Sequence, residues 1–371
     1  MYATIALGII AIILTFLYDK QIFRWGFAVA MISLTVFTAI RYEWGVDMPA
    51  YEKMFNEINT QSEVLSDLFK FDIIGLKSGE YGWRILNYLC QPIGFFGMTM
   101  LISAFEGCVV YWFIKKYVPL GYLWFAVFIY VFNSNLLVLG CSMMRQWLAT
   151  CIILTAMPAF AKGRPIRYFL LVYIASTIHT SALLFAPLFL FRILRNMELT
   201  LSRMVPLVFV TLLWLYVLGN MLGGRFFDYL FSSDTFEMYS SYQVSIVNSE
   251  NDLVGSASLL NCIIILICVF VSYKSSQDIT AITWLMFGYI IVLPLLARVP
   301  MMGRLTFYCE TIGLMAFPNG YKNIKSSILK TIILIWILFW YLYLFFGFFS
   351  DSNWRHSFYE YHTIFEAPYW M

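Results

Sequence analysis

The stretch IASTIHTSALLFAP, residues 174–187, lies in the middle of an apolar run that extends from Tyr168 to Phe191. It brings Ser, Thr, His, Thr and Ser close together at the midpoint of that run. A single continuous helix would carry these polar side chains through the centre of an otherwise apolar segment. The stretch therefore predicts a break near His179, at which the chain turns back as a helical hairpin.

The composition of the whole chain predicts that it resides in a membrane. Of its 371 residues, 61% are hydrophobic and only 12% are charged, whereas about 25% are charged in an ordinary soluble domain. A membrane-spanning helix needs about 20 mostly apolar residues, and such runs recur between Tyr2 and Phe349. We expect an all-α polytopic integral membrane protein with about 11–12 transmembrane segments, the broken hairpin included.

The expected membrane segments follow the apolar runs. They are Tyr2–Tyr18, Trp25–Ile40, Pro92–Ile114, Leu120–Phe132, Met143–Phe160, Tyr168–Phe191, Met204–Leu222, Ala257–Tyr273, Ile279–Ala297, Leu305–Pro318 and Ile328–Phe349.

The distribution of Lys and Arg predicts the orientation, because short loops rich in these residues stay in the cytoplasm. The pairs Lys20 with Arg24 and Lys115 with Lys116 mark alternate loops, which puts the N-terminus outside. If Tyr168–Phe191 crossed the membrane once, every later basic loop would fall on the outer side. A hairpin returns those loops to the cytoplasm, places its tip below the outer surface in protein or a watery cavity, and leaves the C-terminus outside.

The sequence predicts one membrane domain, residues 1–371, with three external parts: a loop at 41–91, a second loop at 223–256 and a tail at 350–371. The first loop should contain amphipathic helices. One begins at Asp47 and presents Tyr51, Met54, Phe55 and Ile58, and a second presents Val64, Leu65, Leu68 and Phe69. The second loop and the tail are aromatic, which suits either sugar rings or anchoring at the membrane interface.

Four arginines are expected near the outer rim of the membrane: Arg41, Arg145, Arg298 and Arg304. An arginine near the membrane core costs roughly 2.5–3.5 kcal/mol. Arg145 alone could extend its side chain to the headgroups, but four together favour a ligand. The planar guanidinium binds phosphate oxygens in pairs, so the group predicts a phosphorylated lipid headgroup.

Other polar residues in the membrane segments give weaker indications. Glu106 and Glu310 are most simply buried partners for an arginine or caps for the backbone, with a catalytic or transport role as the alternative. A lone His179 would more often be structural, but it lies at the depth at which the arginines converge. The seven Cys mostly lie in apolar runs, and no Cys or His spacing indicates a metal. We expect neither a cofactor nor a metal.

Four short stretches resemble the EpsG-like branch of Wzy-type polysaccharide polymerases, and GRLTFY, with Arg304 and Tyr308, resembles a later arginine segment of that family. The four are RYEWGVDMPAYEKMF with Arg41, Gly45, Asp47, Tyr51 and Phe55; GEYGWRILNYL with Glu80 and Gly82; RQWLA with Arg145, Gln146 and Ala149; and HTSAL with His179, Ser181 and Ala182.

The resemblance implies a glycosyltransferase of the bacterial cytoplasmic (inner) membrane whose active site faces outside. Such enzymes move a growing glycan from undecaprenyl pyrophosphate to a lipid-linked oligosaccharide repeat unit. The implied partners are that undecaprenyl-pyrophosphate-linked oligosaccharide and membrane lipid, with a chain-length regulator and a flippase, and no nucleic acid.

Within that reading, Arg145 and Arg304, with Arg41 and Arg298, are expected to bind the pyrophosphates. His179 could orient a phosphate or accept a proton. Asp47 and Glu80 are candidate general bases, with helix capping and loop solvation as the alternatives. A transporter or flippase for the same glycan, or a ligase with another acceptor, would need a similar set of residues.

Overall fold

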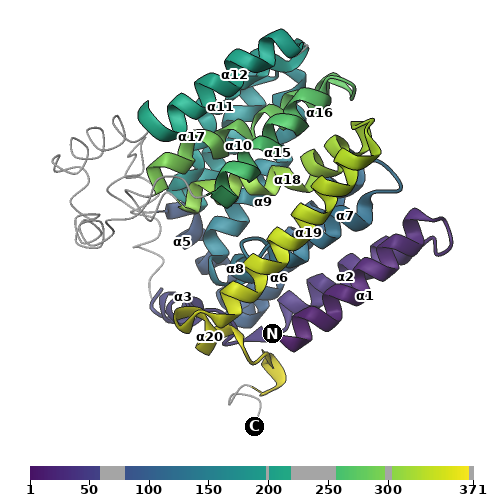
Figure 1. The fold of residues 1–371 in the computed structure, drawn as a ribbon. Helices are drawn as coiled ribbons and strands as arrows, with labels where there is room; N and C mark the ends of the chain where they lie inside the picture. The colour runs from purple at the N-terminus through teal and green to yellow at the C-terminus, as the bar shows by residue number, and fades with distance from the viewer. Residues whose placement is uncertain (59–79, 198–199, 219–255, 297–302, 367–371) are drawn as a thin grey trace. The chain divides into compact units, whose positions relative to one another are not determined.

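The computed structural model describes residues 1–58, 80–197, 200–218, 256–296 and 303–366 (Figure 1). The described chain is predominantly helical. It divides into two compact units, a first unit of residues 1–157, 165–186 and 327–371 and a second unit of residues 158–164 and 187–326. Within the described ranges, three segments are long and apolar enough to cross a membrane: Tyr2–Asp19, Tyr81–Tyr117 and Ser327–Ser350. The number of crossings beyond these three stays a prediction.

The first unit is built on long apolar helices. Its elements are α1 (Tyr2–Asp19), α2 (Gly26–Ala39), β1 (Arg41–Tyr42), α3 (Met48–Asn56), α5 (Tyr81–Cys90), the 3₁₀ turn η1 (Gln91–Ile93), α6 (Gly94–Tyr117), α7 (Leu123–Phe132), α8 (Leu137–Ser142), α9 (Met144–Lys162), α10 (Pro165–Ile178), η2 (Thr180–Leu184), α11 (Phe185–Leu188), α19 (Ser327–Ser350), α20 (Ser352–Phe358), β2 (His362–Thr363) and η7 (Ile364–Glu366). Helix α1 packs against α2 and α7, and α2 packs against α6 (Figure 1).

The second unit contains shorter elements: η3 (Phe189–Asn196), α12 (Leu201–Leu213), a π-helical turn (Trp214–Leu218), α15 (Ser256–Ser272), α16 (Gln277–Trp284), α17 (Phe287–Leu296) and α18 (Gly303–Asn323). Helix α18 packs against α15, α16 and α17.

One end of the first unit carries two basic turns. The carboxylate of Asp19 accepts hydrogen bonds from the backbone N–H groups of Gly121 at 2.8 Å and Trp124 at 2.9 Å. These bonds hold the turn after α1, which contains Lys20, next to the turn after α6. Helix α6 ends with Lys115 and Lys116, so the basic residues that the sequence assigned to the cytoplasm share one end of this unit.

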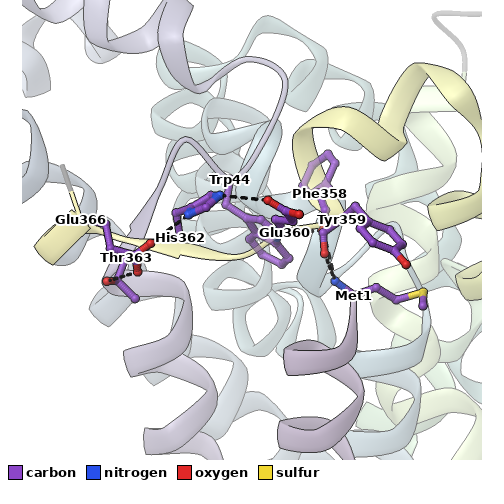
Figure 2. A network of polar contacts seen from close by, with 8 residues as sticks. All are labelled: Met1, Trp44, Phe358, Tyr359, Glu360, His362, Thr363 and Glu366. Atoms are coloured by element: carbon purple, nitrogen blue, oxygen red, sulfur yellow. Dashed lines mark hydrogen bonds and ion pairs between the residues drawn. The ribbon is translucent and has the colours of Figure 1, made fainter. Parts of the chain in front are cut away.

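The N-terminus and the C-terminal tail meet in the first unit. The Met1 ammonium group donates hydrogen bonds to the carbonyl oxygens of Tyr359 at 2.6 Å and Phe358 at 3.3 Å (Figure 2). Strand β2 pairs antiparallel with β1, so that Arg41 lies opposite Thr363. The indole N–H of Trp44 donates to the carbonyl of Phe358 at 3.1 Å (Figure 2).

Several aromatic side chains of the tail pack inward. Phe358 is fully buried, and Tyr361 stacks on Phe37 with the ring centroids 4.1 Å apart. The described part of the tail therefore covers the segment that follows α2. Contact of the tail with sugar rings stays a prediction, and it applies to the tail's exposed side chains, such as Phe365.

The helix break near His179 is confirmed. Helix α10 ends at Ile178, and His179 is extended with φ −148° and ψ 117° before the 3₁₀ turn η2 begins. The Tyr168 hydroxyl, near the start of α10, donates to the carbonyl of Phe185 at 2.6 Å. The returning chain therefore lies alongside α10 as a hairpin would. Its depth in a membrane stays a prediction.

Two expected segments differ from the structure in detail. The expected membrane segment Ile279–Ala297 contains a short interruption between α16 and α17, where the backbone changes to bonds between residues three apart, such as Gly288 N–H to the Leu285 carbonyl. That this segment crosses a membrane stays a prediction. In the first loop, Tyr51 and Phe55 are buried, whereas Met54 is exposed.

Met54 and Ile58 differ from the expectation because of the length and rotation of α3. This helix spans only nine residues and buries Met48, Tyr51 and Phe55 along one stripe. Ile58 lies beyond its end. The second amphipathic stretch, Val64 to Phe69, and most of the loop at 223–256 lie outside the described residues.

Candidate functional site

Three of the predicted site residues meet in the first unit: Glu80, Arg145 and His179. Glu80 directly precedes α5, Arg145 is the second residue of α9, and His179 lies at the break after α10. An Arg145 guanidinium nitrogen contacts Oε2 of Glu80 as a close ion pair. Nδ1 of His179 lies 2.9 Å from Oε1 of the same carboxylate, a salt-bridge distance without hydrogen-bond alignment. The carboxylate therefore joins the guanidinium of Arg145 and the imidazole of His179.

A close approach of two helices brings Glu80 to His179. At Gly82, a Cβ would lie 2.2 Å from Oγ1 of Thr177 and 3.0 Å from the Thr177 backbone carbonyl carbon. Only glycine therefore allows α5 to lie this close to the end of α10. The Thr180 N–H also donates to Oε1 of Glu80 at 3.3 Å, so the hairpin turn itself supports the carboxylate.

Helix α3 supplies an aromatic wall beside Arg145. The guanidinium carbon lies 5.4 Å from the centre of the Tyr51 ring, a distance at which a cation is attracted to the ring face. The Tyr51 ring in turn packs on Trp83, with centroids 5.5 Å apart. Arg145 is thus held between an acid and an aromatic ring, and 31% of its side chain remains exposed.

Asp47 lies at the start of α3, close enough for its charge to act on Arg145. It is half-buried, and its side chain makes no capping hydrogen bond to the helix. Its backbone N–H is bonded to the Ser142 hydroxyl at 3.2 Å. Gly45, with φ +135°, allows this approach, because a Cβ there would lie 3.1 Å from the Ser142 Cα.

The electrostatics of the cluster favour an ionised Glu80. Burial of its carboxyl acts to raise the pKa, but His179, Arg145 and the Thr180 N–H together outweigh burial and lower the pKa below its ordinary value of 4.5. Burial has the dominant effect on Tyr51 and raises the pKa of its phenol. At neutral pH the cluster therefore contains a carboxylate and a protonated tyrosine beside the arginine.

Comparison with known families identifies the chain. The model described as the EpsG family matches residues 24–363, which include the whole cluster. The chain belongs to the EpsG family. Membership indicates a membrane protein with a role of the polysaccharide polymerase type. No curated protein and no solved structure matched the chain.

Arg41 of this EpsG-family chain points into the protein. It is 1% exposed, and its guanidinium donates to the Thr38 carbonyl, to the Ser103 hydroxyl at 2.9 Å and to the Cys141 carbonyl at 3.5 Å. Glu106, one turn after Ser103 on α6, is buried and close enough for its charge to act on Arg41. The pairing of Glu106 with an arginine stays a prediction. Pyrophosphate binding by Arg41 stays a prediction.

The remaining two arginines are not placed at the cluster. Arg304 is the second residue of α18 in the second unit, and its side chain is not described. Arg298 lies outside the described residues. Their predicted contact with pyrophosphate also stays a prediction. Among the described residues, no group of three or more His, Cys, Asp or Glu side chains could hold a metal ion.

Sequence reasoning missed the structural partners of the cluster. Tyr51 and Gly82 were both noted in the family-like stretches, but their contacts with Arg145 and Thr177 could not be read from spacing. Trp83 was quoted within the GEYGWRILNYL stretch, but no role was assigned to it. The common signal is that each follows a site residue by two to four positions in the same short stretch.

Proposed function

We propose that this chain is a polysaccharide polymerase that transfers a growing glycan from undecaprenyl pyrophosphate to a lipid-linked oligosaccharide repeat unit. The observation that carries the proposal is the contact of Glu80 with both Arg145 and His179 in a chain of the EpsG family. A fixed cation beside a held imidazole suits a reaction in which a pyrophosphate leaves and a hydroxyl attacks.

The proposed reaction makes one bond and breaks one. The acceptor sugar's hydroxyl oxygen bonds to the anomeric carbon of the donor glycan, and the bond from that carbon to the pyrophosphate oxygen breaks. The hydroxyl proton passes to a base, and undecaprenyl pyrophosphate leaves. Arg145 supplies positive charge where negative charge develops on the leaving group, a contribution that is largest when the charge is already in place.

His179 is the proposed base. Its Nδ1 lies 2.9 Å from the Glu80 carboxylate. In the proposed reaction a proton on Nδ1 is held by that carboxylate, and the Nε2 lone pair accepts the proton of the acceptor hydroxyl. Glu80 itself is a weak base, because its lowered pKa lies far from neutral pH. Glu80 is therefore assigned to positioning His179 and Arg145. Asp47, half-buried near Arg145, is the alternative base.

The proposed side of the membrane follows from the two basic turns. If Lys20, Arg24, Lys115, Lys116 and Lys162 all lie in the cytoplasm, then Arg145, at the opposite end of α9 from Lys162, lies toward the outer face. The chain would work in the bacterial cytoplasmic membrane with its active site outside. Arg304, Arg298 and Arg41 remain proposed as further pyrophosphate ligands. A chain-length regulator and a flippase are the proposed protein partners.

Purified protein in liposomes tests the proposal. The substrate is its undecaprenyl-pyrophosphate oligosaccharide, supplied without nucleotide sugar, and the readout is product length on a gel. Wild type should give a ladder, and Arg145→Ala should lose it. Glycan that crosses the bilayer at unchanged length would identify a flippase. Transfer only to an acceptor other than a lipid-linked repeat would identify a ligase.

A further inference from the structure

An apolar groove begins beside the Glu80–Arg145–His179 cluster. It lies in the first unit among helices α5, α6, α9 and α10 and has a volume of about 420 Å³. This is within the roughly 300–1,000 Å³ of typical ligand sites. Its walls are almost entirely aliphatic or aromatic, with Ile85, Leu101, Phe105, Leu148 and Ile152 among them.

Residues of the groove wall lie next to the charged cluster in the chain. Ile178 directly precedes His179, and Leu148 lies about one helical turn after Arg145. Ile152 lies one turn further along α9. Because an α-helix rises about 1.5 Å per residue, the apolar wall extends roughly 10 Å from Arg145 along this helix. A charged cluster next to an apolar groove suits an amphiphilic ligand, whose charged end would contact the cluster and whose apolar chain would occupy the groove.

The groove is open on one side. Three residues of its wall remain well exposed: Leu89 at 66%, Leu101 at 58% and Phe105 at 41%. Helix α6, which carries Leu101 and Phe105, belongs to a segment long and apolar enough to cross a membrane. In a bilayer this side would therefore face hydrocarbon, so that a lipid chain could enter from the membrane without passing through water.

We propose that this groove binds the isoprenyl chain of a polyprenyl phosphate carrier, with the phosphate end at Arg145. The inference rests on the proposed function for the identity of the lipid and extends it to a site for the tail. Charge complementarity fixes the orientation, since the described residues that line the groove carry no charge and Arg145 lies next to the wall residue Leu148 on α9. A single groove of about 420 Å³ suits one chain, whereas a phospholipid brings two acyl chains to each phosphate.

Photo-crosslinking tests the site directly. The probe is undecaprenyl monophosphate with a diazirine on an isoprene unit near the phosphate, added to the full-length protein in nanodiscs. Mass spectrometry then locates the labelled peptides. Label should appear on α6 and α9, and excess undecaprenyl monophosphate should remove it. Dioleoyl phosphatidic acid, which has the same phosphate on two acyl chains, should not compete.

Variants that fill the groove provide a second test of the site in the same crosslinking experiment. Leu101→Trp and Ile152→Trp should each lower labelling by about tenfold, equivalent to about 1.4 kcal/mol of binding. Because Leu101 is exposed, its substitution should leave the fold intact, as a thermal unfolding curve would show. Ile335→Trp on α19 is the matched control. Ile335 is also exposed and apolar, at 62%, but lies outside the groove, so its labelling should not change.

The outcomes separate this inference from the proposed function. Groove labelling without any polymer formation would retain the lipid site and reject the polymerase. Polymer formation with label elsewhere, with equal competition by phosphatidic acid, or with full labelling of both groove variants would reject the isoprenyl site and retain the polymerase.

Discussion

Glu80 contacts both Arg145 and His179, so its charge determines how the cluster is held together. The carboxylate is mostly buried, with 15% of its side chain exposed. It lies between Arg145 and His179 and accepts the Thr180 N–H. Removing its charge without changing its size should therefore disturb both neighbours at once.

Glu80→Gln should lower kcat by roughly a hundredfold or more, because a misplaced general base loses most of its contribution. If Glu80 only positions other groups, KM for the lipid-linked donor should change much less than kcat. Steady-state kinetics in proteoliposomes measures both. An increase in KM alone would instead make Glu80 a binding residue.

The same substitution should remove a contribution to stability that depends on pH. The pKa of Glu80 is lower in the folded chain than its ordinary value of 4.5. The ionised carboxylate therefore stabilises the fold at pH values above 4.5, and this contribution is lost as the pH falls through the folded-state pKa. The difference in Tm between wild type and Glu80→Gln should be full at pH 7 and should shrink in acid. A constant difference would contradict the assignment.

Arg41 and Glu106 are expected to behave as a buried pair. If the two form a direct ion pair, Arg41→Met alone should destabilise the fold by about 3–5 kcal/mol, because Glu106 would stay buried without its cation. The double variant Arg41→Met with Glu106→Leu should recover much of that loss. Thermal unfolding in detergent would show the recovery. Normal stability with lost activity in the single variant would instead support the predicted role in pyrophosphate binding.

At the scale of elements, the approach of α5 to α10 sets the geometry of the site. Gly82→Ala would place a methyl group against Thr177, which should move α5 and separate Glu80 from His179. Overpacking of this kind typically costs about 1–3 kcal/mol, so activity should fall while the protein still folds. Gly347→Ala on α19 is the control, since its Cβ would meet nothing within 4 Å. Equal activity of the two variants would show that the close approach is dispensable.

Most helices could be predicted because their signal is local. The apolar run Tyr2–Tyr18 became α1, Tyr2–Asp19, and Met143–Phe160 became α9, Met144–Lys162. The break at His179 was predictable because polar residues interrupt such a run. The pairing of Arg41 with Thr363 was not predictable, because it joins residues more than 300 positions apart. No local pattern of apolar residues indicates such a contact.

The sequence indicated Glu80, Arg145 and His179 separately, but not that they contact one another. Glu80 came from a family-like stretch of the acidic loop, Arg145 from its charge in a membrane segment and His179 from the polar break. Arg41 was indicated in the same way as Arg145, yet it points into the protein. An arginine at a membrane boundary can serve a ligand or a buried acid. Which of these applies depends on neighbours such as Tyr51 and Glu106, which only the fold brings together.

At the scale of the whole molecule, the account predicts that the two basic turns and the tail lie on opposite sides of the membrane. The Cys108→Ser background removes the exposed native thiol. In that background, Ile22→Cys would report the side of the basic turn after α1, and Phe365→Cys would report the side of the tail. Both positions are well exposed, at 72% and 70%. In spheroplasts, an impermeant maleimide should label Phe365→Cys, and should label Ile22→Cys only after permeabilisation. The reverse pattern would put the active site in the cytoplasm.

The most direct test of the central claim is to measure how much free undecaprenyl pyrophosphate is released as glycan is joined, in proteoliposomes that contain wild type or Arg145→Ala. The account predicts that wild type releases the lipid pyrophosphate in equal amount to the glycosidic bonds formed, and that Arg145→Ala does neither. Polymer growth without release, or transfer of lipid-linked glycan across the bilayer with the pyrophosphate bond intact, would contradict it.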